Sequence, residues 1–320
     1  MNTEPGELAR RGPAFAALEA AGAVDATRWE QAACWLEREL PDSPRKAERI
    51  HWLTVPVLLW LRDAVEKAAH RPLFAGLSAP QGSGKSTLVQ LLVPLLEVMG
   101  VRAVALSIDD FYLPRDEQLR LAATHPGNRY LEHRGYPGTH AIALGVRTID
   151  ALRHLSPSPR GGAGRGEGMA LPIYDKSAHG GRGDRSPEVR CVRGPFDLVL
   201  LEGWMLGFTP VPVADPALQV INQKLAAYEA WYRHLDVMVS LRAKDPAYVL
   251  RWRTEAEARA RASGKPALSA AEIDDYVQRF LPAYALYAGT VARGRWSPAR
   301  QLALTLDEDR IPCGADRPEP

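Results

Sequence analysis

The chain has 320 residues, of which 46% are hydrophobic, so it can bury a substantial core in one large domain or in a domain with an extension. Its formal net charge of +2 gives the chain as a whole no electrostatic basis for binding nucleic acid or a membrane surface. Three widely spaced cysteines argue against a disulfide framework or a zinc site, and no apolar run approaches the ~18 residues of a membrane span, so a cytoplasmic protein is expected.

The first part of the chain, residues 1–69, has helical periodicity and no strand pattern. Periodic segments rich in Ala, Leu, Trp and Glu lie near residues 14–21, 29–40 and 45–69, and a prolyl break separates them at residues 41–44. The pattern predicts a helical extension packed on the domain that follows, and none of its residues has an evident chemical role.

An apolar run that begins at Leu73 ends in the string Ser78-Ala-Pro-Gln-Gly-Ser-Gly-Lys-Ser86, just before a helical pattern over residues 85–99. This order is typical of a phosphate-binding loop, in which backbone N–H groups surround nucleotide phosphates and the lysine reaches the β- and γ-oxygens. The hydroxyl after the lysine holds Mg²⁺ in such loops, and the helix directs its positive dipole end at the phosphates. The nucleotide-binding residues predicted here are Gly82, Ser83, Gly84, Lys85, Ser86 and Thr87.

One position of this loop departs from the strict pattern G-x-x-x-x-G-K-[ST], since Ala79 stands where the pattern has glycine. An ordinary glycine turn before a helix is the alternative to a nucleotide site. The order of strand, loop and helix favours the nucleotide site, with Lys85 and Ser86 at its centre.

From Leu73 onward, strand and helix patterns alternate. Further strands are predicted near residues 102–108, 196–201 and 235–241. Such alternation predicts an α/β fold in which a parallel sheet of the P-loop NTPase type carries helices on both faces. Ligands of these sheets bind beyond the carboxyl ends of the strands, so polar residues at those ends are the candidates for chemistry.

Two segments are predicted to lie outside the packed core. Residues 156–168 are rich in Gly, Pro and Ser and poor in apolar residues, which is typical of a flexible insertion. The chain from Glu308 onward has a similar composition, and residues 311–320 are predicted to be a tail.

Carboxylates follow two of the predicted strands. Asp109 and Asp110 come directly after one apolar run, and Glu202 ends another. Beside a phosphate loop, a carboxylate can accept the proton of an attacking hydroxyl or help to hold Mg²⁺. Turns, helix caps and salt bridges use the same residue types. Taken with the loop, the pattern predicts Asp109 as the base and Ser86 and Glu202 as the metal-binding residues.

The polar stretch at residues 172–185 is rich in groups that bind an anionic or hydroxylated small molecule. Its cations suit a carboxylate or a phosphate, and its Tyr and Asp side chains suit hydroxyls. A solvated loop is the alternative, and the same holds for the Pro-Gly turn after Arg134. His140, at the end of that turn, receives no proton-transfer role. The predicted acceptor-binding residues are Asp110, Tyr112, Arg134, Tyr174, Lys176, Arg182 and Arg185.

A polar helix is predicted over residues 248–262, and it carries four arginines. Most charges on such a helix are solvated. Phosphoryl-transfer enzymes nevertheless often close an arginine-bearing segment over the nucleotide, because negative charge spreads over the γ-oxygens in the transition state. Arg251 and Arg253 are predicted to have this catalytic role, together with Lys85 and Asp109.

A set of longer strings carries a resemblance to a known family. They are the loop string above, Ser107-Ile-Asp-Asp-Phe-Tyr-Leu113, Arg134-Gly-Tyr-Pro-Gly-Thr-His140, Tyr174-Asp-Lys-Ser177 with Gly181-Arg-Gly-Asp-Arg185, Glu202-Gly-Trp-Met-Leu-Gly-Phe208, Ile221-Asn222 and Arg279-Phe-Leu-Pro-Ala-Tyr284. Over about residues 73–287 the chain resembles the plant-type D-glycerate 3-kinases. It is more distantly similar to uridine kinase, phosphoribulokinase and bacterial pantothenate kinase, in which an Asp in a position like Asp109 is the base.

The resemblance implies a P-loop kinase domain at residues 70–310 that uses ATP and Mg²⁺ to phosphorylate the 3-hydroxyl of D-glycerate in the cytosol. The cationic residues would then bind the acceptor's carboxylate. One alternative is a kinase for a nucleoside or another hydroxylated metabolite. A second is a nucleotide-gated regulatory binding protein, although the chain has no N-K-x-D guanine signature, since residues 222–225 read Asn-Gln-Lys-Leu.

Overall fold

The computed structural model describes residues 6–155, 168–262, 264, 269–291 and 300–316. The predicted insertion near residues 156–168 therefore lies outside the described residues, except for Gly168. Within the described ranges, no helix combines the length and the apolar character that a membrane span needs.

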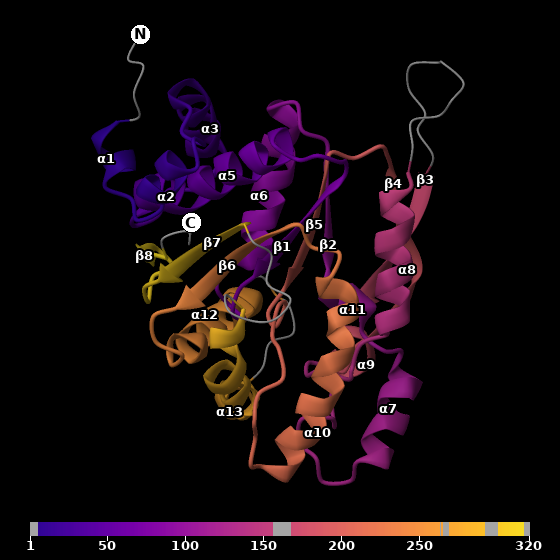
Figure 1. Cartoon of the computed structure of the whole chain (residues 1–320). Coiled ribbons are helices and arrows are strands. Elements are labelled where there is room, and N and C mark those ends of the chain that lie inside the picture. Colours follow the sequence, from indigo (N-terminus) through magenta and orange to yellow (C-terminus); the bar gives the residue numbers. More distant parts are fainter. Residues whose placement is uncertain (1–5, 156–167, 263, 265–268, 292–299, 317–320) are drawn as a thin grey trace.

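The centre of the molecule is a six-stranded sheet in the order β2-β5-β1-β6-β7-β8 (Figure 1). Its strands are β1 (Leu73–Ser78), β2 (Ala103–Ser107), β5 (Leu198–Gly203), β6 (Val237–Ala243), β7 (Arg300–Leu306) and β8 (Pro312–Ala315). All neighbouring pairs are parallel except β7 and β8. The predicted α/β class is confirmed, and every residue of β1 and β5 is buried, as expected for a parallel sheet covered on both faces.

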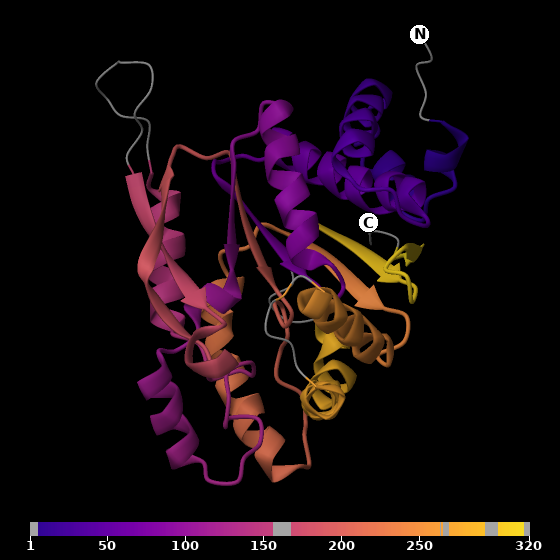
Figure 2. The ribbon, with the colours of Figure 1, turned by 180° about the vertical axis from the view of Figure 1, so that it is seen from behind.

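Alternate strand residues point to two separate cores. Leu73, Ala75 and Leu77 of β1 pack with the N-terminal helices and α6 (Lys85–Val98). Phe74 points the other way, into a core that it shares with the helices of the opposite face. Those helices are α8 (Ile142–Arg153), α10 (Pro216–Leu225), α11 (Glu229–Tyr232) and α13 (Ala270–Tyr287). The two layers lie on opposite sides of the sheet in Figures 1 and 2.

The N-terminal region is helical, as predicted. Its helices are α1 (Glu7–Arg10), α2 (Phe15–Ala20), α3 (Ala26–Glu39), α4 (Lys46–Glu48), a π-helical segment (Arg49–Thr54) and α5 (Val55–Glu66). Asp25 precedes helix α3, and its carboxylate accepts the N–H of Arg28 at 3.0 Å and so caps the first turn. Helix α5 is buried along almost its whole length, because it lies between the other N-terminal helices and the sheet.

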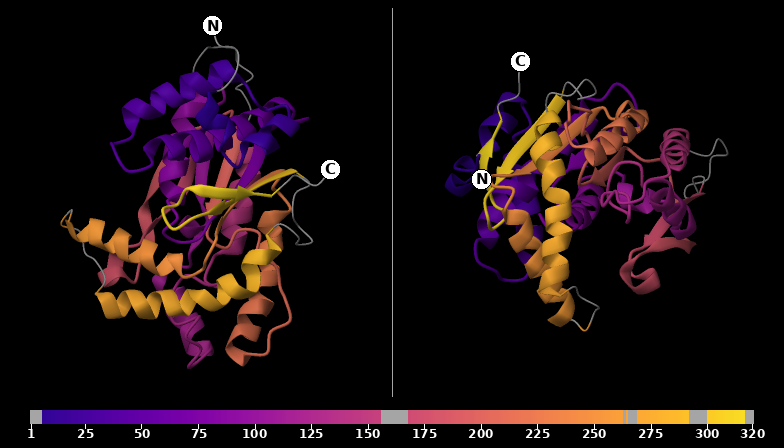
Figure 3. Two further views of the ribbon diagram at one scale, coloured as in Figure 1. Left: turned by 90° about the vertical axis from the view of Figure 1, so that its left-hand side faces the viewer. Right: turned by 90° about the horizontal axis from the view of Figure 1, so that it is seen from below.

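A hairpin of β3 (Gly168–Asp175) and β4 (Asp184–Arg193) forms a separate two-stranded sheet that the sequence patterns did not predict. The smaller elements are α7 (Arg115–Thr124), α9 (Ala178–Gly181) and the 3-10 turns Ile108–Phe111, Ala226–Tyr228 and Ala288–Thr290. Helix α12 (Tyr248–Ala262) packs beside α13, and Figure 3 shows the two long helices side by side below the sheet.

The predicted tail is wrong for residues 312–315, which form β8. This strand pairs antiparallel with β7, with Ala315 opposite Leu304. Part of the polar composition that suggested a tail belongs to the turn at residues 307–311, where the Asp307 carboxylate accepts the N–H groups of Asp309 and Ile311 at 3.0 and 2.9 Å. These polar groups are therefore bonded within the fold. Residues 317–320 of the predicted tail lie outside the described residues.

Candidate active site

The phosphate loop lies at the carboxyl end of β1, and its backbone requires two glycines. Gly82 and Gly84 have φ values of +77° and +88°, in the left-handed region. A Cβ at Gly82 would in addition lie 2.8 Å from Cβ of Trp252. Gly84 caps α6, so Lys85, Ser86 and Thr87 form the first turn of this helix, as predicted.

Two further residues of the loop are buried. Ala79, the departure from the strict pattern, is 1% exposed and donates its N–H to the carbonyl oxygen of Gly203 at 3.2 Å. The Ser83 hydroxyl is also buried, and it has no hydrogen-bond partner among the described residues. An unpaired buried hydroxyl in a loop of this shape fits a site whose ligand supplies the missing partner.

Lys85 forms an ion pair with Glu202 at the carboxyl-terminal ends of β1 and β5. Both side chains are largely buried, with 13% and 8% exposed. Strand pairing explains the contact, since Leu77 of β1 lies opposite Glu202 on β5 and the lysine comes shortly after that strand. The phosphate-loop lysine and the predicted metal-binding carboxylate are therefore in direct contact.

Asp109 forms a second ion pair, with Lys176 of the β3–β4 hairpin, at 2.5 Å between Oδ2 and Nζ. Burial by itself would raise the pKa of Asp109, but the ammonium groups of Lys176 and Lys85 outweigh it and hold this pKa well below its usual range. The charge of Asp109 in turn raises the pKa of Lys176. Lys85, Glu202, Asp109 and Lys176 thus form one cluster of alternating charge.

The neighbouring residues Asp110 and Tyr112 fix the geometry around Asp109. Asp110 accepts the backbone N–H of Tyr174 at 3.4 Å, and burial raises its pKa. The Tyr112 ring is buried and stacks on His140, with centroids 4.2 Å apart. Burial lowers the pKa of His140 to about 3, so this ring is neutral near pH 7, in keeping with its having no predicted role in proton transfer.

The predicted acceptor-binding arginines mostly bind backbone carbonyls. Arg134 donates to the carbonyl oxygens of Gly181 and Lys176 at 2.9 and 3.2 Å, and its guanidinium lies 5.5 Å from the ring centroid of Tyr174. Arg185 donates to the carbonyl of Tyr112 at 2.9 Å, and Arg182 contacts the ring of His133. Among these cations, Lys176 is the one that contacts Asp109, and Arg134 holds the segment that carries it.

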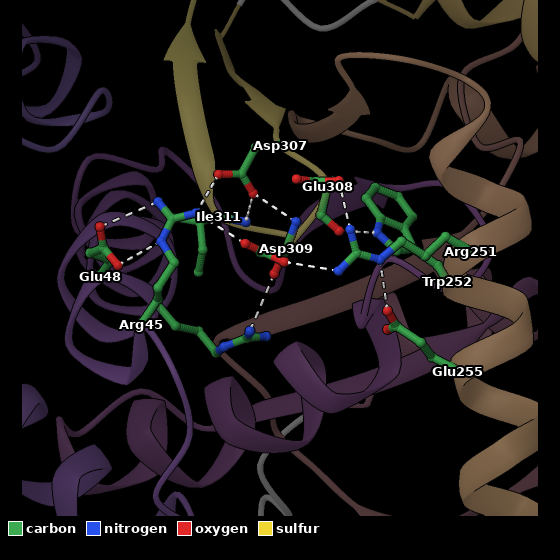
Figure 4. Close-up of polar contacts among 10 residues, drawn as sticks. Arg45, Glu48, Arg251, Trp252, Glu255, Asp307, Glu308, Asp309 and Ile311 are labelled. Carbon is green, nitrogen blue, oxygen red and sulfur yellow. Dashed lines mark hydrogen bonds and ion pairs between the residues drawn. The ribbon is translucent and has the colours of Figure 1, made fainter.

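Two of the four arginines of α12, Arg251 and Arg253, point to different places. Arg251 is bound to Glu255, Glu308 and Asp309 at 3.0, 2.6 and 3.2 Å, next to the β7–β8 turn (Figure 4). Arg253 pairs with Glu257 and lies 4.6 Å from the ring centroid of Tyr276 on α13. Burial raises the pKa of Tyr276, and the charges of Arg253 and Asp109 also act on it. Arg253 is therefore on the side of the acceptor cluster, and Arg251 is not.

The sequence analysis missed two side chains that bind the phosphate loop directly. The Tyr284 hydroxyl accepts the N–H of Gln81 at 2.9 Å, and Arg310 donates Nε–H to the carbonyl of Gly82 at 2.7 Å. Tyr284 was part of the family strings but received no role. Arg310 lies four residues after the end of β7, in the turn before β8, and no strand was predicted over residues 300–306, so the strand-end rule gave no signal for it.

Comparisons with known proteins show which proteins the chain is similar to. No protein-family model matches the chain. It is 41% identical over 297 residues to "D-glycerate 3-kinase, chloroplastic" of Arabidopsis thaliana, which covers 85% of this chain and 62% of that protein. It is 32% identical to "Uncharacterized kinase mug58" of Schizosaccharomyces pombe, over 81% of this chain and 97% of that protein.

A solved structure shows the same fold. The chain matches "D-glycerate 3-kinase from Cryptococcus neoformans" with a TM-score of 0.71 and 25% identity, over 94% of this chain and 99% of the other. The chain spans only about 62% of the plant relative's length, whereas it covers nearly all of the fungal ones. With the phosphate loop, the sheet order and these similarities together, the chain belongs to the family of P-loop kinases that includes the Schizosaccharomyces pombe protein.

Proposed function

We propose that this protein transfers the γ-phosphoryl group of ATP to the 3-hydroxyl of D-glycerate and so produces 3-phosphoglycerate. The observation that carries the proposal is the single charge cluster of Lys85, Glu202, Asp109 and Lys176, which joins the phosphate loop to a candidate base and to a cation for the acceptor. The names of the plant and fungal relatives support D-glycerate as the acceptor.

The residues present fit a bound nucleotide and Mg²⁺. Lys85 and the N–H groups at the start of α6 would hold the phosphates, and Ser86 and Glu202 would hold the metal ion. Within the described ranges, no group of three or more His, Cys, Asp or Glu side chains could bind a metal. A site with few protein ligands suits Mg²⁺, which usually keeps water and phosphate oxygens in its shell. Bound Mg²⁺ would neutralise charge on the phosphates.

Asp109 is the residue that would take the proton of the acceptor hydroxyl. In the proposed step, the 3-oxygen forms a bond to the γ-phosphorus, the bond to the β–γ bridging oxygen breaks, and ADP leaves with that oxygen. The hydroxyl proton passes to the Asp109 carboxylate, which is ionised at neutral pH because its pKa is low. The acceptor's carboxylate would pair with Lys176 and loosen the hold of this ammonium on Asp109.

A panel of acceptors tests the proposal. Purified protein with MgATP should form ADP and 3-phosphoglycerate with D-glycerate, and glycerol, which lacks the carboxylate, should be a poor acceptor. Turnover with uridine or pantothenate instead of D-glycerate would favour the alternative kinase. Slow ATP hydrolysis that no acceptor changes would favour a regulatory nucleotide-binding protein.

The cytoplasmic location and the division of the chain remain proposals. Cys34, Cys191 and Cys313 are all exposed free thiols, which suits a reducing compartment. The plant relative carries the word chloroplastic in its name, so a fluorescent fusion followed by microscopy and cell fractionation is the appropriate test. We also propose that the kinase domain begins at residue 70 and includes β8, and that residues 1–69 are its extension.

A further inference from the structure

The turn at residues 307–311 joins β7 to β8 and has a fixed backbone. Besides the two N–H groups that bind the Asp307 carboxylate, the N–H of Arg310 donates to the Asp307 carbonyl at 3.0 Å. Arg310 has φ of +66°, a conformation that non-glycine residues seldom adopt, and the residue is only 9% exposed. The turn therefore directs one long cationic side chain into the protein.

The Arg310 guanidinium binds three groups at once. Nε donates to the carbonyl oxygen of Gly82 at 2.7 Å, and Nη1 pairs with the Glu255 carboxylate at 2.7 Å. Nη2 lies 3.5 Å from the carbonyl oxygen of Trp252, whose ring centroid is 5.3 Å from the guanidinium carbon. A planar guanidinium with five donors can make these contacts together, and an ammonium cannot.

Gly82 is consequently held from two sides. Arg310 binds its carbonyl, and Trp252 packs so closely on its Cα that a Cβ at this position would clash. Trp252 is fully buried and donates its indole N–H to the carbonyl of Glu308 at 2.7 Å, so α12 and the turn are locked together (Figure 4). The conformation of the phosphate loop thus depends on the position of this turn.

The N-terminal region holds the same turn from the opposite side. Arg45 pairs with Asp307 at 2.6 Å and with Asp309 at 3.5 Å, and Glu48 fixes Arg45 at 2.8 Å (Figure 4). Arg49 donates to the carbonyl of Asp309 at 3.3 Å. A continuous set of contacts therefore runs from the N-terminal helices through the turn to Gly82.

We propose that Arg310 is a positioning residue for nucleotide binding, and that it keeps the phosphate loop in its binding conformation by fixing the carbonyl of Gly82. Through the same turn, the N-terminal helices support the loop without contacting it. This inference rests on the proposed function only in that the loop binds nucleotide. It does not depend on the identity of the acceptor.

Three variants test the inference. Arg310→Met keeps an apolar stem against Trp252 but removes all donors, and Arg310→Lys keeps the charge without the planar fork. Arg300→Met is the matched control, because Arg300 also pairs with a carboxylate, that of Asp63, and lies 5.1 Å from the ring centroid of Trp60. Arg300 begins β7 at the end remote from the phosphate loop, whereas Arg310 follows the other end of that strand.

The measurements are the dissociation constant for MgADP by calorimetry, Tm, and hydrogen exchange of peptides that cover residues 79–88. We expect Arg310→Met to weaken MgADP binding about tenfold, the usual effect of losing one charge-assisted hydrogen bond, and to speed exchange in those peptides. Arg310→Lys should restore part of the affinity. Arg300→Met should lower Tm but leave the affinity and the exchange of the loop unchanged.

Unchanged MgADP affinity in Arg310→Lys and Arg310→Met would overturn the inference. So would equal weakening in Arg300→Met at the same loss of Tm, since the effect would then be general destabilisation. If Arg310→Met does not fold, Arg310→Lys alone decides between these outcomes. A protein that binds MgADP normally but does not phosphorylate D-glycerate would refute the proposed function and leave this inference standing.

Discussion

The two lysine–carboxylate pairs of the site differ in their surroundings. Lys85, at the start of α6, and Glu202, near the end of β5, are largely buried, whereas the Lys176 side chain is 58% exposed and belongs to a hairpin outside the main sheet. Both charged groups of a buried pair are desolvated, and their attraction offsets that cost. Removing one partner leaves the other as an uncompensated buried charge. An exposed ammonium can exchange its partner at little cost.

This difference suggests a division of labour, in which one pair serves nucleotide binding and the other serves acceptor binding. Under the proposed function, the Lys85 pair would belong to the fixed part of the site, which binds the nucleotide. The Lys176 pair would belong to the part that rearranges when an anionic acceptor binds. Substitutions of the two lysines should therefore affect different measured quantities, and by different amounts.

The largest effect is expected from Lys85→Met. This change removes the cation from the phosphates and leaves Glu202 buried without a partner, so transfer should fall on the order of 10³-fold and Tm should also fall. Steady-state kinetics and calorimetric melting measure both quantities. Ordinary turnover in this variant would show that the lysine has no part in the reaction.

The next largest effect is expected from Asp109→Asn. The amide keeps the shape of the side chain but cannot take a proton, so kcat should fall about 10²-fold while MgATP affinity is kept. Nucleotide affinity measured by calorimetry separates this outcome from a role in binding Mg²⁺. Lost affinity with unchanged chemistry would assign Asp109 to the metal instead.

Local sequence signals were sufficient where a strand leads directly into a functional residue. Lys85, Asp109 and Glu202 were found in this way, because parallel strands bring their carboxyl ends to one edge and the residues after them meet there. The β3–β4 hairpin gave no such signal. Most of its residues are exposed or only partly buried, so apolar alternation was absent, and its partnership with Asp109 depends on tertiary packing.

Helix geometry explains why Arg251 and Arg253 have different surroundings. Residues two apart on a helix project about 200° from each other, so they cannot both face one site. Helix geometry therefore excluded a shared role, but the sequence could not tell which arginine faces the acceptor. That choice follows from the packing of α12 against α13 and the β7–β8 turn.

A smaller effect, and one of a different kind, is expected from Lys176→Met. The loss of an exposed cation should change Tm little, yet it should raise KM for D-glycerate about tenfold, because one charge-assisted contact with the acceptor carboxylate is removed. KM for MgATP should stay unchanged. Leu119→Met, on the exposed surface of α7, serves as the control. A raised KM for MgATP with unchanged KM for D-glycerate would contradict the division of labour.

The smallest expected effect is a shift in the pH dependence of kcat/KM. The lowered pKa of Asp109 means that its carboxylate contributes stability above the ordinary value of about 3.9, and this contribution is lost only as the pH falls through the lowered pKa. Wild-type kcat/KM should therefore show no loss from Asp109 protonation near pH 5. The charges that lower the pKa of Asp109 are those of Lys176 and Lys85, since His140 is neutral near pH 5.

In Lys176→Met, burial of Asp109 is opposed by Lys85 alone, so the pKa of Asp109 must rise and the acid limb of kcat/KM must move to higher pH. Profiles from pH 4.5 to 9 on both proteins would measure the shift. Identical acid limbs would mean that Lys176 does not control the protonation of Asp109 during turnover, and the two pairs would then differ only in exposure.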